Sequence, residues 1–193
     1  MFIRLPIQLN ISELKDYLAS AQSTCAPFIK KDSPWGGWSI TSSNGEVYDG
    51  WQSGEKIFQE NISDEEKIKL HLELRNKKFD VPTALYSPII DNILGQLKQF
   101  DLKTTRIRLV VLRPHLERDS YWHQDGKNTP NYFKLRLHIP IITNPKCVFQ
   151  YRDQSFHLPA DGSAYIIDVS KEHRVLNESN EDRFHLMMDL LSY

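Results

Sequence analysis

The chain has 193 residues, of which 40% are hydrophobic, and its 24 Lys and Arg nearly balance its 25 Asp and Glu, giving a formal net charge of −1. This balance argues against a dedicated binder of nucleic acid or of anionic membranes, because such proteins concentrate positive charge. The hydrophobic content excludes a disordered chain, and the length predicts a single domain over residues 1–193.

The two cysteines, Cys25 and Cys147, lie far apart and form no Cys-x-x-Cys spacing. They therefore argue against a disulfide scaffold and indicate a reducing compartment. Residues 1–6 lack the apolar run of a secretory signal, and no stretch reaches the roughly 18 apolar residues of a membrane span. We expect a cytoplasmic protein whose first residues form an edge strand.

Residues 1–105 carry mixed helix and hairpin signals and are expected to support a catalytic half. Asn10 is placed to cap a first helix. The Ser-x-x-Glu spacing at residues 63–66 is a capping box and predicts the start of a second. A Ser-Pro pair at residues 87–88 puts proline at the first position of a third helix, whose apolar face is suited to packing on a sheet.

The dipeptide Asn44-Gly45 predicts a tight hairpin between strands at residues 38–41 and 46–48. Three tryptophans lie in or near this hairpin: Trp35, Trp38 and Trp51. They would either form a lid that stacks on a substrate or pack onto the barrel, as hairpin aromatics more often do. Trp38 is the candidate substrate contact among them.

From residue 106 onward the pattern is almost entirely strand and turn. The clearest strand is 134–142, where Leu and Ile alternate with Arg136 and His138. Strands are predicted at residues 106–112, 134–142, 147–151, 155–158, 163–168, 173–177 and 183–191. Such short, evenly spaced strands after a helical half predict a mainly β, α+β fold: a small antiparallel barrel or sandwich in residues 106–193, backed by N-terminal helices.

His123 and Asp125 are the strongest candidates for chemistry. Side chains at i and i+2 of an extended segment lie on the same side, and His173 begins a later strand that can complete the set. Two imidazoles and one carboxylate on one face of a metal leave open positions, which is the facial triad of non-haem Fe(II) oxygenases. The alternative is a polar surface loop that contains a His-x-Asp pair by chance.

Three further cationic or titratable residues fit a co-substrate. Arg183 stands ten residues after His173, where its guanidinium could bind the distal carboxylate of a dicarboxylic acid, or form an ordinary salt bridge to Asp182 or Glu181. Arg136 and His138 share the non-aliphatic side of their strand, which faces either a metal-bound carboxylate or solvent.

Arg113 ends the strand at residues 106–112 on the same side as Ile107, Leu109 and Val111. If that side faces the interior, Arg113 points into the barrel mouth and could meet a substrate carboxylate. A surface position is the alternative.

Together these elements resemble one protein family. The order is His123-x-Asp125, Arg136-Leu-His138, Gly162 before a strand ending in Asp168, His173-x-Val-x-Asn, and Arg183-x-His185 with Asp189. Over residues 106–191 this is similar to the aspartyl/asparaginyl β-hydroxylase-like branch of the Fe(II)/2-oxoglutarate oxygenases, which includes amino-acid hydroxylases of the proline cis-hydroxylase type.

The resemblance implies a double-stranded β-helix, or jelly roll, with His123, Asp125 and His173 as iron ligands. It implies that Arg183 binds the C5 carboxylate of 2-oxoglutarate and that Arg136 and His138 lie near its C1 carboxylate and the iron. The mammalian aspartyl hydroxylase lacks the carboxylate ligand, whereas this sequence keeps Asp125. That difference favours a hydroxylase with a complete triad and argues against halogenase chemistry.

The expected activity is therefore a dioxygenase that uses Fe(II), 2-oxoglutarate and O₂. It would hydroxylate an unactivated C–H bond of an amino acid, or of an amino-acid side chain in a short peptide, and release succinate and CO₂. Neither nucleic acid nor a membrane is an expected partner. Two alternatives remain open: a cupin-like metal enzyme that does not use 2-oxoglutarate, and a non-catalytic barrel that binds a small molecule.

Overall fold

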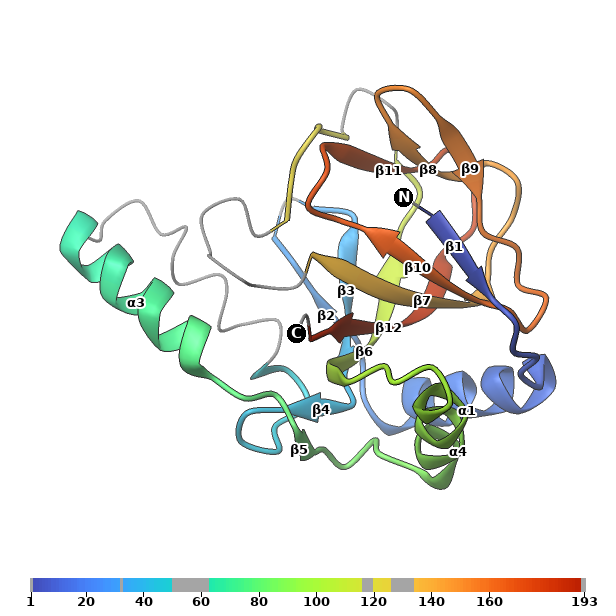
Figure 1. Ribbon diagram of the computed structural model, residues 1–193, viewed down its shortest axis with the longest axis horizontal. Coiled ribbons are helices and arrows are strands. Elements are labelled where there is room, and N and C mark those ends of the chain that lie inside the picture. The colour runs from blue at the N-terminus through green and yellow to red at the C-terminus, as the bar shows by residue number, and fades with distance from the viewer. Residues whose placement is uncertain (1, 32, 50–62, 116–119, 126–133, 192–193) are drawn as a thin grey trace.

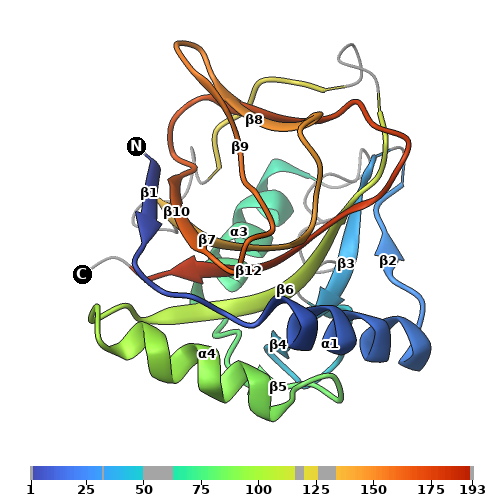
Figure 2. The same cartoon turned by 90° about the vertical axis from the view of Figure 1, so that its right-hand side faces the viewer.

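The computed structural model describes residues 2–31, 33–49, 63–115, 120–125 and 134–191. A large antiparallel sheet faces a smaller one across the interior, and helices cover the opposite side of the large sheet (Figures 1 and 2). Two facing antiparallel sheets are the arrangement of a jelly roll. The expected mainly β fold backed by helices is confirmed.

The large sheet contains seven strands in the order β1-β10-β7-β12-β6-β3-β2. In that order their bounds are Phe2–Leu5, Ala164–Asp168, Leu135–Ile142, Arg183–Leu190, Thr104–Leu112, Trp35–Ser39 and Phe28–Ile29. The small sheet has the order β11-β8-β9, with bounds His173–Asn177, Cys147–Tyr151 and Ser155–His157. A separate pair joins β4 (Thr41–Ser42) to β5 (Val81–Pro82).

The described helices are α1 (Ile11–Thr24), α3 (Asp64–Asn76) and α4 (Pro88–Lys98). Each begins as the sequence predicts. Asn10 Oδ1 accepts from the backbone N–H of Ser12 at 3.0 Å, Ser63 Oγ accepts from the N–H of Glu66 at 3.2 Å, and Pro88 opens α4. Helices α1 and α4 lie under the large sheet in Figure 2 and bury their apolar faces there.

The predicted hairpin is only partly correct. Gly45 has φ +85°, as a tight turn at Asn44-Gly45 requires. Residues 46–48 form no strand, however, and β4 pairs with β5 instead. The reason is local, because the Asp49 carboxylate accepts from both the N–H and the hydroxyl of Ser43, at 3.0 and 2.6 Å. These bonds curl the chain back and prevent an extended second strand.

The large sheet has two faces with different neighbours. The helix face packs on α1 and α4, and the central strands β6, β7 and β12 contribute the following residues to it: Ile107, Leu109, Val111, Leu137, Ile139, Ile141, Phe184, Leu186 and Met188. The inner face looks toward the small sheet, and among its residues are Arg108, Leu112, Arg136, His138, Arg183 and His185. The alternation expected around Arg136 and His138 is therefore confirmed, and their side of the strand is the interior.

No helix in the described part of the chain is long and apolar enough to cross a membrane. Cys25 and Cys147 are both free thiols, as expected for a protein without a disulfide scaffold.

Candidate metal centre

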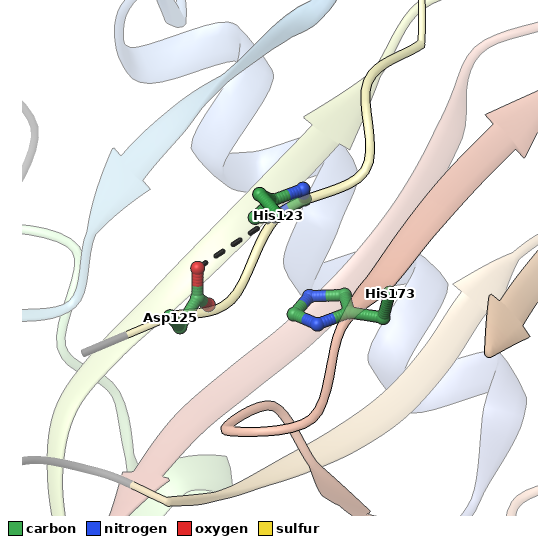
Figure 3. A group of neighbouring side chains, drawn as sticks. All are labelled: His123, Asp125 and His173. Carbon is green, nitrogen blue, oxygen red and sulfur yellow. Dashed lines mark ion pairs between the residues drawn. The ribbon is translucent and has the colours of Figure 1, made fainter. Parts of the chain in front are cut away.

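His123, Asp125 and His173 converge on one point (Figure 3). Their ligand atoms all lie within 4.8 Å of one another. Backbone pairing explains the convergence, because His123 and His173 exchange N–H···O=C bonds of 2.9 and 2.8 Å. The N–H of Asp125 then donates to the carbonyl of Val169 at 2.9 Å. The segment that carries His123 and Asp125 is thus fixed alongside the start of β11.

Both imidazoles are oriented by backbone carbonyls. The Nδ1 atom of His123 lies 3.2 Å from the carbonyl of Tyr121, and the Nδ1 atom of His173 lies 2.8 Å from that of Lys171. A carbonyl only accepts, so each Nδ1 carries the proton and each Nε2 keeps its lone pair for a metal. In each case the carbonyl belongs to the residue two positions before the histidine, a relation that a sequence pattern does not reveal.

His173 is also held by its ring. It stacks on Phe149 of β8 with ring centroids 4.9 Å apart and an interplanar angle of 11°. Burial lowers the pKa of His173, so the neutral form that binds metals is favoured. The sequence identified His173 as a candidate ligand but did not reveal this stacking contact.

Asp125 is placed to act as an anionic ligand. Its Oδ1 lies 3.6 Å from Nε2 of His123, and its Oδ2 accepts from Nη1 of Arg136 at 2.7 Å. Desolvation raises the pKa of Asp125, but Arg136 and the two imidazoles outweigh it and hold the pKa below its ordinary value. The carboxylate is therefore ionised at neutral pH.

Arg183 lies in the interior, and its guanidinium has no carboxylate partner among the described residues. The residue is only 3% exposed. The Nε and Nη2 atoms of its side chain have no hydrogen-bond partner among the described residues. Its guanidinium carbon lies 5.2 Å from the ring centroid of Trp35, and burial lowers its pKa to about 10. Within the described part of the chain it forms no salt bridge with Asp182 or Glu181, so that alternative is wrong.

His138 and His185 lie beside Arg183 on the inner face. Their Nδ1 atoms are 3.4 Å apart, and both Nε2 atoms are buried without a hydrogen-bond partner among the described residues. Burial, followed by the charge of Arg183, lowers the pKa of both histidines well below its ordinary value. Sequence reasoning gave His185 no role in the site, although its position two residues after Arg183 on one strand places both on the same face.

We call the three buried side chains Arg183, His138 and His185 the inner cationic cluster. Four of their nitrogen atoms lack a protein partner in the described structure. Buried polar nitrogens without partners are costly, and they point to a ligand rich in oxygen.

The two substrate candidates are not supported. Trp38 is fully buried on the helix face, and its Nε1 donates to the carbonyl of Cys25 at 2.9 Å. The prediction for Arg113 assumed that Ile107, Leu109 and Val111 face the interior, but they face the helices. Arg113 is exposed beyond the end of β6, as the surface alternative requires.

The three tryptophans of the predicted lid have different positions. Trp35 packs against the inner core and contacts Arg183, so it lies nearer the candidate centre than Trp38 does. Trp51 lies outside the described residues.

A search of solved structures gives relatives with low sequence identity. An oxidoreductase of the 2OG-Fe(II) oxygenase family from Burkholderia pseudomallei is 14% identical, with a TM-score of 0.51 over 98% of this chain and 84% of that one. The epimerase SnoN from nogalamycin biosynthesis (12% identity, 99% and 78% covered) and IDO from Bacillus thuringiensis (12%, 100% and 93%) both have a TM-score of 0.48. The Burkholderia similarity supports the fold.

No curated protein matches the sequence. The family model for aspartyl/asparaginyl beta-hydroxylase matches residues 51–192, which include all three candidate ligands and the inner cationic cluster of Arg183, His138 and His185. The chain belongs to the aspartyl/asparaginyl β-hydroxylase family.

Proposed function

We propose that the protein is an Fe(II)- and 2-oxoglutarate-dependent hydroxylase that acts on an amino acid or on an amino-acid side chain in a short peptide. One observation carries the proposal: a convergent His-Asp-His set lies in the same interior as a buried arginine that has no ion-pair partner in the part of the chain that the structure describes. The set fits a metal with open positions, and the arginine fits a carboxylate.

His123, Asp125 and His173 would hold the iron. Their donor atoms are two neutral nitrogens and one ionised oxygen, the combination typical of a non-haem Fe(II) centre. With iron and 2-oxoglutarate bound, O₂ would be the oxidant: one of its oxygen atoms would enter the C–H bond, and the other would enter the succinate that forms with CO₂ from 2-oxoglutarate.

The protein's own residues would bind and orient the co-substrate. Arg183 would neutralise its distal carboxylate. The Nδ1 atoms of the neutral His138 and His185 pair with each other, so one of the two rings keeps an Nε2–H that would donate to a carboxylate oxygen. The low exposure of all three side chains keeps the interaction away from water, where it is stronger.

Two alternatives are less well supported. A cupin-like metal enzyme without 2-oxoglutarate has no use for a buried cation, and Arg183 would then be an unexplained cost. A non-catalytic barrel leaves the convergence of three ligand atoms unexplained. The family is described by hydroxylation of aspartyl and asparaginyl residues, which supports an amino-acid or peptide substrate, and we propose a cytoplasmic location.

The test is turnover of anaerobically iron-loaded protein with 2-oxoglutarate and O₂, screened with aspartate, asparagine, proline and short peptides containing them. We expect succinate release that one substrate class stimulates, and its loss in His173→Ala. Protein that binds iron but forms no succinate with any of these substrates would contradict the substrate class. Protein that neither binds iron nor turns over 2-oxoglutarate would contradict the whole proposal.

A further inference from the structure

A chain of charged contacts leads from the metal centre into the large sheet. Arg136 donates from Nη1 to Oδ2 of Asp125 and from Nε to Oδ1 of Asp189, and both distances are 2.7 Å. Asp189 is completely buried, and Arg106 and Arg108 approach it to 3.8 and 3.6 Å. Arg136 is thus held between two carboxylates, one of which belongs to the candidate metal ligand.

This contact distinguishes the two oxygens of Asp125. Oδ2 is occupied by the guanidinium, whereas Oδ1 lies on the side of His123, 3.6 Å from its Nε2. A carboxylate with one oxygen bound in this way presents the other to a metal as a single donor. Without the contact, the group could rotate and offer either oxygen or both.

The residue type matters as much as the charge. A guanidinium is a rigid fork whose donors can serve two carboxylates at once, whereas a lysine ammonium is a point charge on a flexible stem. Since two donor atoms of Arg136 are already committed, its surroundings differ from those of Arg183, which offers unpartnered donors.

We propose that Arg136 is a positioning residue for the metal: anchored by Asp189, it holds Oδ2 of Asp125 so that Oδ1 faces the two imidazoles. Co-substrate binding then belongs to Arg183 rather than to Arg136. This inference rests on the proposed function, because it assumes that Asp125 is a metal ligand.

The experiment measures two affinities separately in each variant. Co(II) is titrated into the metal-free protein and followed by its visible absorption. The affinity for 2-oxoglutarate is then measured at Co(II) concentrations that saturate each variant. The key variant is Arg136→Gln. Its matched control is Arg106→Gln, which removes another cation beside Asp189 that does not contact Asp125 in the described structure.

We expect Arg136→Gln to lower Co(II) affinity about 10- to 100-fold, the range typical for residues that orient metal ligands. The Co(II) absorption spectrum should also change, because Asp125 is free to rotate. Affinity for 2-oxoglutarate should stay within about twofold of wild type. Arg106→Gln should leave both affinities unchanged.

Three results would overturn the inference. One is unchanged Co(II) affinity with weaker 2-oxoglutarate binding in Arg136→Gln, which would return Arg136 to the co-substrate. Another is an equal loss of Co(II) affinity in both variants, which would indicate a general charge effect. The third concerns Arg136→Lys, which replaces Arg136→Gln if that variant does not fold. Wild-type Co(II) affinity and spectrum in Arg136→Lys would show that the position needs no guanidinium.

Failure of the proposed function looks different. There, wild-type protein binds no Co(II), or His173→Ala binds it as tightly as wild type. If wild-type binding depends on His173 and Arg136→Gln leaves it unchanged, only the positioning role is wrong.

Discussion

The helix face and the inner face of the large sheet are built from alternate residues of the same strands, and both are buried, yet their chemistry is opposite. On β7, Leu137 packs into an aliphatic core while its neighbours Arg136 and His138 face the interior. The helix face gains stability from apolar burial. The inner face holds charged and polar groups whose desolvation is unfavourable unless a ligand or an ion pair compensates. The helix face is therefore expected to contribute mainly to stability, whereas the inner face combines a second apolar cluster with the candidate site.

The largest expected effect comes from Arg183→Met on the inner face. Removing a buried charge that binds an anion costs about 2–5 kcal/mol of binding free energy, so affinity for 2-oxoglutarate should fall roughly 30- to 5,000-fold. Because a buried cation without an ion-pair partner among the described residues is replaced by an apolar chain, the free energy of unfolding should stay constant or rise, by up to about 4 kcal/mol.

The measurements are urea unfolding of the metal-free protein and 2-oxoglutarate titration of the Co(II) form. A large loss of stability together with unchanged 2-oxoglutarate affinity would reverse the assignment and make Arg183 a structural residue.

Leu137→Ala probes the helix face at the position between Arg136 and His138. Leu137 is completely buried in the aliphatic core, so truncation should lower the free energy of unfolding by about 2–5 kcal/mol. Affinity of the folded protein for Co(II) and 2-oxoglutarate should not change, because the side chain points away from both. The same unfolding and titration experiments check this. Weakened ligand binding at full folding would show that the two faces are coupled.

The pH dependence of stability tests whether the inner histidines are neutral. Their pKa values are well below the ordinary value in the folded protein, so below about pH 6.5 only the unfolded chain gains a proton at each site. The unfolded state then binds more protons, and the free energy of unfolding falls as the pH drops, by about 1.4 kcal/mol per pH unit for each histidine. This contribution to stability is fully present above pH 6.5.

Urea unfolding of metal-free protein between pH 7.5 and 5 measures that slope. His185→Leu should reduce it by about one histidine's share, roughly 1.4 kcal/mol per pH unit. Asp125 and Asp189 have lowered pKa values, so they lose their charge at lower pH than an ordinary carboxyl and do not contribute in this range. An identical slope in wild type and variant would show that His185 does not titrate as a buried neutral group.

Strands β7 and β12 show how far the sequence alone predicts the two faces of the large sheet. Alternation separates the two faces of a strand, because side chains alternate with period two. It does not say which layer covers each face, since that depends on strands and helices far away in the chain. Alternation therefore leaves two placements open for the side that carries Ile107, Leu109, Val111 and Arg113, and in the structure that side packs on helices.

The candidate site was predictable where the chemistry is carried by residue type and spacing, as for His123, Asp125 and His173. The supporting contacts were not. Arg136 and Asp189 are 53 residues apart in sequence, and their 2.7 Å contact arises only because β7 and β12 pair in a register that places them opposite each other. No local pattern contains that register. His185 differs from these contacts, because it lies two positions after Arg183 on one strand and alternation alone places both side chains on the same face.

The smallest predicted effect separates two tryptophans on β3. Trp35 and Trp38 are three positions apart, so they point to opposite faces, Trp35 toward Arg183 and Trp38 into the helix-side core. Trp35→Leu removes the ring beside the Arg183 cation, an interaction worth about 0.5–2 kcal/mol. Loss of the ring frees the guanidinium to move, so 2-oxoglutarate affinity should fall by roughly 2- to 30-fold while Co(II) affinity stays constant. Trp38→Leu should instead lower the free energy of unfolding and leave 2-oxoglutarate affinity unchanged. If both variants behave alike in the two titrations, the sheet does not separate stability from function at this strand.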